Sequence, residues 1–271
     1  MRLSQEQVRQ FRTQGYLILD RLFGPEEAEA LQDAFQRDSL IPGDHRVAEQ
    51  DGGEVRAVYA SHTRQHEFAA LIRTPRVLGP VRQLLGGEAY IYQFKINAKA
   101  PFSGAGWSWH QDFAAWQMAD QLRLPRLVNV GVFLDEVNEF NGPVIFCPGS
   151  HRDGLVKRGR AAGPTASEQH VDPEDIALTP ADMTGLVERH GLVSAKGAAG
   201  TVVLFDPEIV HGSAPNMAPF RRRLLIVTYN DVTNVPQPVG EPRPEYVVGR
   251  DTAPLELTDQ EEIVPALEVM V

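Results

Sequence analysis

The stretch "AYIYQFKIN", residues 89–97, marks the point where the periodicity of the sequence changes from helical to alternating. Its aromatic and β-branched residues are typical of strands. The chain carries 23 glycines and 20 prolines, which often fall at the ends of such runs as turn residues do. Four more short apolar runs follow: "LVNVGVFL" (127–134), "PVIFC" (143–147), "TVVLF" (201–205) and "LLIVTYN" (224–230). Short strands at these intervals predict a mainly β fold, a double-sheet jelly roll.

Helices are expected to flank this core on its N-terminal side, over about residues 4–86. Ser4 is a plausible N-cap, and Val8 and Phe11 follow at helical spacing before Gly15 and an alternating strand. A second helix is expected in "GPEEAEALQDAFQRD" (24–38), with proline in its first turn. A third is expected in "PRVLGPVRQLLGG" (75–87), although it contains Pro80.

The jelly-roll core is expected over about residues 89–235, interrupted by a polar, weakly periodic insertion at 152–199. A long loop inside a compact domain is usually a functional lid or a disordered segment, and both readings stay open for this insertion. Because no repeat and no convincing linker divides the sequence, we expect a single domain over residues 1–271.

The composition narrows the class of ligand and the compartment. A net charge of -10 argues against a nucleic-acid partner, because phosphate binding needs a clustered positive field. No apolar run is long enough to cross a bilayer, so no membrane partner is expected. Cys147 is the single cysteine, which excludes an internal disulfide and favours a reducing, cytoplasmic location. The chain should therefore bind a small molecule; its oligomeric state stays open.

A candidate metal site begins in "WHQDFAAW", residues 109–116. On extended chain, residues two apart point to the same face, so His110 and Asp112 can converge on one point. The strongest third ligand is His211, in "FDPEIVHGSAPN" (205–216) directly after a predicted strand. Two imidazoles and one carboxylate form the facial triad that binds non-haem iron(II) and leaves positions open. Zinc would accept the same ligands, and an isolated HxD is often only a surface pair.

Arg222 follows His211 by eleven residues, at the start of the run "RRLLIVTYN" (222–230). A chain that turns after His211 and returns antiparallel could place this arginine across the pocket from the metal. The alternative is that "RRR" (221–223) is a solvated strand edge. Strand periodicity sends Arg222 to the face opposite its two neighbours, so these three arginines cannot all share one environment.

The order HxD, distant histidine, then arginine resembles that of the iron(II)- and 2-oxoglutarate-dependent dioxygenases of the phytanoyl-CoA dioxygenase superfamily. The segments "WHQDFAAW" and "FNGPVIFCPGSH" are similar to ectoine hydroxylase. Other segments look closer to the free L-amino-acid hydroxylases of the leucine 5-hydroxylase type. These are "VRAVYASHTRQ" (55–65), "QFKIN" (93–97), "VNVGVFLDEVNEFNGPV" (128–144), "HGSAPN" (211–216) and "GEPRPEYVVGRDT" (240–252). The similarity covers roughly residues 4–253.

The resemblance implies a double-stranded β-helix of the cupin-like kind that uses Fe(II), 2-oxoglutarate and O2. His110, Asp112 and His211 would bind iron, and Arg222 would pair with the distal carboxylate of 2-oxoglutarate. A guanidinium suits that role because it matches a carboxylate bidentately and stays charged. By the same comparison, further neighbours of the co-substrate would be Lys95, Asn97, Trp107 and Ser213.

A free amino acid would need a cation for its carboxylate, and Arg243 and Arg56 are the candidates. His62 and Asp231 are weaker polar candidates, and Phe113 could be a pocket wall or core. Ordinary surface ion pairs remain an alternative for the charged residues.

Other activities also stay open. An acyl-CoA hydroxylase could use a basic cluster in the insertion, formed by Lys157, Arg158 and Arg160. Ectoine hydroxylation, a zinc hydrolase on the same ligands, and a non-catalytic jelly-roll binding protein are the remaining alternatives. The sequence leaves open which amino acid and which carbon would be hydroxylated.

Overall fold

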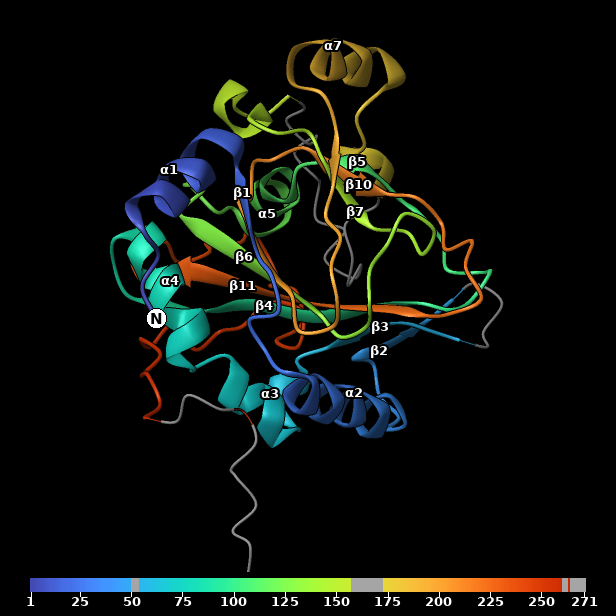
Figure 1. Ribbon diagram of the computed structural model, residues 1–271. Coiled ribbons are helices and arrows are strands. Elements are labelled where there is room, and N and C mark those ends of the chain that lie inside the picture. The colour runs from blue at the N-terminus through green and yellow to red at the C-terminus, as the bar shows by residue number, and fades with distance from the viewer. Residues whose placement is uncertain (50–53, 157–172, 260–262, 264–271) are drawn as a thin grey trace, which may run out of the picture.

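The computed structural model describes residues 1–49, 54–156, 173–259 and 263. Two antiparallel sheets form its centre (Figure 1). The large sheet has the strand order β1-β9-β6-β11-β4-β3-β2. In chain order its strands are β1 (Tyr16–Leu19), β2 (Arg46–Ala48), β3 (Val55–Tyr59), β4 (Ala89–Lys99), β6 (Leu127–Phe133), β9 (Val202–Phe205) and β11 (Arg222–Asp231). The mainly β, double-sheet fold predicted from the sequence is confirmed.

The small sheet has the order β5-β10-β7-β8 and carries two of the three candidate metal ligands. Its strands are β5 (Trp107–His110), β7 (Val144–Phe146), β8 (Val193–Ser194) and β10 (His211–Ser213). An apolar cluster that includes Phe133, Phe146 and Phe205 fills the space between the two sheets. Packing between two sheets therefore fixes where β5 and β10 lie.

Four helices cover the outer face of the large sheet: α1 (Gln5–Gln14), α2 (Pro25–Ser39), α3 (His66–Leu71) and α4 (Pro75–Leu85). Figure 1 shows α2 and α3 beneath the β2–β3–β4 edge. The Ser4 hydroxyl accepts the Gln7 N–H at 3.1 Å, and the Gln7 side chain accepts the Ser4 N–H at 2.8 Å. This capping box begins α1, which ends at Gly15 with a φ of 78°. Helix α4 continues through Pro80, as the sequence had suggested.

The structure differs from the sequence analysis in three places. The region 4–86 also supplies strands β2 and β3 to the large sheet. Helix α5 (Asp112–Asp120) begins at Asp112 itself, where extended chain had been considered. The insertion at 152–199 contains η2 (Ser150–Asp153) at its start, then α6 (Pro173–Ile176), α7 (Pro180–His190) and β8, so it is not purely a loop. A 3-10 turn, η1 (Ser61–Thr63), completes the elements.

None of the helices in the described ranges is both long and apolar enough to cross a bilayer. The free thiol of Cys147 is buried beneath α7, against Leu178, Met183 and Leu186.

Candidate active site

His110, Asp112 and His211 come together beside the paired strands β5 and β10 of the small sheet. Because β5 and β10 pair antiparallel with His110 opposite His211, the two imidazoles lie side by side, with ring centroids 4.3 Å apart. Asp112 Oδ1 lies 3.5 Å from His110 Nε2, and Asp112 Oδ2 lies 3.8 Å from His211 Nε2. Each residue offers one possible ligand atom, and these three atoms all lie within 4.8 Å of one another. Gln111 is extended (φ -120°, ψ 124°), so His110 and Asp112 face the same side although α5 begins at Asp112.

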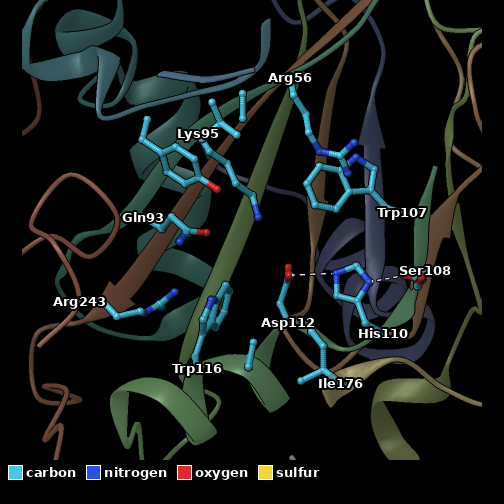
Figure 2. Close-up of a pocket in the computed structure, with 14 residues that line it drawn as sticks. Arg56, Gln93, Lys95, Trp107, Ser108, His110, Asp112, Trp116, Ile176 and Arg243 are labelled. Atoms are coloured by element: carbon cyan, nitrogen blue, oxygen red, sulfur yellow. Dashed lines mark hydrogen bonds and ion pairs between the residues drawn. The ribbon is translucent and has the colours of Figure 1, made fainter. Parts of the chain in front are cut away.

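Both imidazoles are oriented by main-chain carbonyls. His110 Nδ1 donates to the Ser108 carbonyl at 2.7 Å, and His211 Nδ1 donates to the Ile209 carbonyl at 3.0 Å. A carbonyl can only accept, so each ring carries a proton on Nδ1, and Nε2 is the nitrogen that faces the shared centre. Figure 2 shows His110 held between Ser108 and Asp112 in this way. This arrangement is typical of metal-binding histidines.

Asp112 is held by a buried polar chain that the sequence analysis did not identify. Asn129 Nδ2 donates to Asp112 Oδ2 at 2.9 Å, and the Thr228 hydroxyl donates to Asn129 Oδ1 at 2.7 Å. Asn129 and Thr228 are opposite each other on the central strands β6 and β11, and both are fully buried. The only sequence signal was a polar residue inside each apolar run.

The charges at this centre favour a cation. Burial and then the nearby His110 lower the pKa of His211 to about 4, so its imidazole is neutral at ordinary pH. Burial would raise the pKa of Asp112, but the adjacent His211, His110 and Lys95 hold it well below its usual range. The neutral imidazole of His211 and the ionised carboxylate of Asp112 are in the protonation states that a metal requires. The donor set, two nitrogens and one carboxylate, fits a facial triad for iron(II).

A first cavity, of about 60 Å³, opens on one side of the triad. It contains every residue that the resemblance assigned to the co-substrate: Lys95, Asn97, Trp107, Ser213 and Arg222. Arg222 is 2% exposed, and its Nη2 donates to the Gly142 carbonyl at 2.6 Å. Burial lowers the pKa of Arg222 to about 10, so it remains a cation at neutral pH.

The three consecutive arginines separate as strand periodicity requires. Arg223 forms a bidentate ion pair with Asp135, and Arg221 is exposed. Arg222 alone faces the cavity, and within the described ranges no carboxylate forms an ion pair with it.

A second cavity, of about 260 Å³, adjoins the first at the triad (Figure 2). It shares four residues with the first: Lys95, Trp107, His110 and Asp112. Its other polar side chains are Arg56, Tyr59, Gln93, Ser108 and Arg243, and its apolar walls are Val47, Ala57, Ala115, Trp116 and Ile176. Gln93 and most of the apolar residues of this cavity were not identified from the sequence. They lie on separate strands and helices, and only the fold brings them together.

Both arginines proposed for the substrate line this second cavity. Asp120 accepts from Arg243 Nε at 2.9 Å and from Arg243 Nη2, and the Tyr92 hydroxyl also bonds this carboxylate. The Arg56 guanidinium lies 4.4 Å from the centre of the Trp107 ring and 3.1 Å from the Glu49 carboxylate. The two guanidiniums are therefore fixed in place before any ligand binds.

Three other predicted contacts lie away from the triad. Phe113 packs in an apolar cluster with Trp116, because one helical step after Asp112 turns it into the core. His62 stacks on Phe94 and lines a separate cavity. Asp231 pairs with Arg126 at the far end of β11.

Two further groups of residues bear on the alternatives. The basic cluster considered for coenzyme A, Lys157, Arg158 and Arg160, lies outside the described residues. His151, the last residue of "FNGPVIFCPGSH" and a rival candidate for the third ligand, bonds the Arg12 carbonyl through Nε2 at 3.0 Å and does not belong to the triad.

Comparison with known proteins gives consistent matches along most of the chain. The model of the phytanoyl-CoA dioxygenase (PhyH) family matches residues 11–224. The chain is 36% identical to L-proline trans-4-hydroxylase of Streptomyces griseoviridis over 92% of this chain and 94% of that protein. It is 33% identical to ectoine dioxygenase of Nocardia farcinica, covering 92% and 86%.

Among solved structures, EctD from S. alaskensis with 2-oxoglutarate and 5-hydroxyectoine superposes with a TM-score of 0.82 at 30% identity, covering 94% of this chain and 87% of that one. EctD from the same source with bound Fe gives a TM-score of 0.81. With the triad and its two cavities, these matches show that the chain belongs to the phytanoyl-CoA dioxygenase family and is an Fe(II)- and 2-oxoglutarate-dependent dioxygenase.

Proposed function

We propose that the enzyme hydroxylates an unactivated C–H bond of a free L-amino acid with a leucine-like aliphatic side chain, converting 2-oxoglutarate to succinate and CO2. His110, Asp112 and His211 hold the iron, and Arg222 binds the distal carboxylate of 2-oxoglutarate. The observation that carries the proposal is the meeting of two cavities at one triad, one with an unpaired arginine and one with mixed polar and aliphatic walls. We likewise assign the enzyme to the cytoplasm, where the free thiol of Cys147 stays reduced.

The first cavity suits a small dianion. Arg222 has no acidic partner among the described side chains, and Ser213 and Asn97 add polar groups beside it. A buried cation without an anion is costly, so a carboxylate that enters here gains strongly from the contact. When bound, iron, 2-oxoglutarate and oxygen supply the oxidising power, and the protein's task is to place the correct carbon and exclude water.

The second cavity suits an amino acid. Asp120 occupies the Nε and Nη2 side of Arg243, which leaves the N–H groups of Nη1 for a substrate carboxylate. The side chain of Lys95 has no hydrogen bond or ion pair within the described part of the chain, and it adds a third basic group to this cavity beside Arg56 and Arg243. The walls formed by Val47, Ala115 and Ile176 fit an aliphatic side chain better than a charged one.

The volume of the second cavity also favours a small substrate. At about 260 Å³ it lies below the roughly 300–1,000 Å³ that is typical of drug-sized ligands. A free amino acid fits this space, whereas the nucleotide of an acyl-CoA would have to lie outside it. The relatives named for proline and ectoine favour a second candidate, a cyclic amino acid whose ring would lie against the flat indole of Trp116.

The test is an activity screen. Protein loaded with Fe(II) without oxygen is mixed with 2-oxoglutarate, then exposed to air with each common L-amino acid, ectoine or an acyl-CoA. Mass spectrometry follows products that gain one oxygen atom, together with succinate. We expect a leucine-like acid to give both products, and Asp112→Ala to give neither while keeping a native circular-dichroism spectrum. Succinate formation that needs no amino acid, or oxygenation of acyl-CoA alone, would contradict the proposed substrate class.

A further inference from the structure

Helix α5 carries a residue of the site at each of its two ends. Asp112, its first residue, is the proposed metal ligand, and Asp120, its last residue, holds Arg243 in the second cavity. Trp116, halfway between them, forms part of the wall of the same cavity. Residues four apart lie on one face of a helix, and all three of these side chains are buried. A single rigid element therefore connects the metal ligand to the arginine proposed for the substrate carboxylate.

Asp120 lies at an electrostatically unfavourable place. Its carboxylate is 2% exposed and stands at the C-terminal end of α5, where the main-chain carbonyls disfavour a negative charge. A carboxylate buried there needs a cation and hydrogen bonds to compensate it. Arg243 donates to it from Nε at 2.9 Å and from Nη2, and the Tyr92 hydroxyl donates to the same carboxylate. The carboxylate and the guanidinium therefore fix each other in place.

The direction of the Arg243 side chain depends on this contact. Arg243 lies between Pro242 and Pro244, in a segment without helix or strand. A long side chain on such a segment has many rotamers of its own. The bidentate contact with Asp120 selects one of them, because a guanidinium and a carboxylate match in a single plane. The position of the guanidinium is thus set by α5.

Both ends of α5 are anchored on the large sheet. At the start, Asn129 of β6 donates to Asp112 at 2.9 Å. At the end, Tyr92 of β4 donates to Asp120, and its ring packs edge-to-face on Trp116 with centroids 5.2 Å apart. At about 1.5 Å per residue, the helix spans about 12 Å from residue 112 to residue 120. The distance between the metal ligand and the holder of Arg243 is therefore fixed by the fold.

We propose that α5 sets which carbon of the substrate is hydroxylated, with Asp120 as the positioning residue. Asp120 directs Arg243, and Arg243 holds the substrate carboxylate at a fixed distance from the metal on Asp112. This inference rests on the proposed function, the hydroxylation of a free amino acid in the second cavity. A fixed distance means that the reacting carbon is counted from the carboxylate and not from the end of the side chain. L-norvaline, L-leucine and L-norleucine should then react at the same carbon number.

The first measurement follows the distance from the metal to the substrate protons without turnover. Protein loaded with Mn(II) and 2-oxoglutarate, kept free of oxygen, is titrated with each of the three amino acids, and the paramagnetic relaxation of their protons is measured by NMR. Nitrogen and carboxylate ligands accept Mn(II), and its effect on relaxation falls steeply with distance. In the wild type the strongest enhancement should fall on one carbon, with the same number in all three amino acids. An enhancement that follows the last carbon, one position further in norleucine than in norvaline, would overturn the proposal.

Asp120→Asn tests whether the aspartate does the positioning. The change keeps the size of the side chain but replaces one acceptor with an NH2 donor that faces the guanidinium. The enhancement should then be shared between neighbouring carbons, and the Fe(II) enzyme in air should give products at more than one carbon. A displacement of about 1 Å can cost about 100-fold in rate, so kcat should fall by about 10- to 100-fold. Glu27→Gln breaks another ion pair, with Arg76 on the outer face, and should keep the single position.

The position of the hydroxyl separates positioning from a general loss of stability, which would not move it. Asp120→Asn that gives one product, at the wild-type carbon, would overturn the proposal. If Asp120→Asn does not fold, the comparison of the three amino acids in the wild type decides it.

The same measurements separate this inference from the proposed function. If the loaded wild type shows no enhancement on any of the three amino acids, the proposed substrate class fails, and the role of α5 fails with it. If the wild type binds them in one orientation and Asp120→Asn leaves that orientation unchanged, only the role of α5 is refuted.

Discussion

Asn129 is the residue whose replacement most sharply tests how the proposed metal ligand Asp112 is held. The change Asn129→Ala removes the donor to Asp112 Oδ2 at 2.9 Å and the acceptor of the Thr228 hydroxyl at 2.7 Å. All three side chains are buried, so water cannot readily replace the lost partners. The perturbation leaves the three proposed ligands in place and changes only their support.

Two losses follow from this geometry. A hydrogen bond to an ionised group contributes about 1.5–3 kcal/mol and a neutral one about 0.5–1.5 kcal/mol, so the metal-free variant should be less stable by about 2–4 kcal/mol. Loss of a residue that orients a ligand usually weakens metal binding by about 10- to 100-fold. At fixed metal concentration, the stabilisation by metal should therefore fall by about 1.4–2.7 kcal/mol.

Urea unfolding with and without Zn(II), together with calorimetric titration of the metal, measures both quantities. Thr228→Val is the matched control, because it removes only the outer hydrogen bond and keeps the Asn129 donor. It should cost about 1 kcal/mol of stability and leave the metal affinity within a few-fold of wild type. A folded Asn129→Ala protein that binds metal as tightly as wild type would refute the reasoning.

Four further outcomes are expected. Arg222→Met should raise the KM for 2-oxoglutarate by about 100-fold or more while changing the KM for the amino acid little, and equal changes in steady-state kinetics would contradict its role. Arg243→Lys should raise the KM for the amino acid and change the KM for 2-oxoglutarate little, because a lysine cannot bind Asp120 and a substrate carboxylate together. An unchanged KM for the amino acid would show that Arg243 is not part of the substrate site. Burial raises the pKa of the Cys147 thiol to about 11, so iodoacetamide should label it only after unfolding, and rapid labelling of the native protein would show that it is accessible. Burial lowers the pKa of Lys99 in the folded protein to about 6, below its unfolded value, so Lys99→Met should raise the free energy of unfolding of the ligand-free protein most at low pH. In urea unfolding, the gain in stability over the wild type should shrink by up to about 1.4 kcal/mol per pH unit above pH 6. A gain in stability that does not depend on pH would contradict this prediction.

The sequence was most informative where the relevant residues are close in the chain or follow a strand pattern. His110 and Asp112 share a face because the chain is extended through Gln111, and that could be expected from their spacing. Arg222 is separated from Arg221 and Arg223 by strand alternation alone. The pairing of β5 with β10, which brings in His211, depends on contacts between distant segments. The sequence offered only the position of His211 directly after a predicted strand, and the family resemblance supported that choice.

The remaining site residues depend on contacts that spacing does not encode. Phe113 follows a proposed ligand directly, yet the start of a helix at Asp112 turns it into the core. Asp231 lies on the same strand as Arg222 but at its opposite end. Asn129 gained its role from Asp112, a partner more than ten residues away in the chain, so it did not stand out in the sequence.

The most direct test of the central claim is a crystal structure of the Fe(II) and 2-oxoglutarate complex, prepared without oxygen and measured at the iron absorption edge. The account predicts a single iron peak about 2.0–2.2 Å from Nε2 of His110, Nε2 of His211 and a carboxylate oxygen of Asp112. It also predicts the distal carboxylate of 2-oxoglutarate on the Arg222 guanidinium. An iron peak elsewhere, or a 2-oxoglutarate that does not contact Arg222, would contradict it.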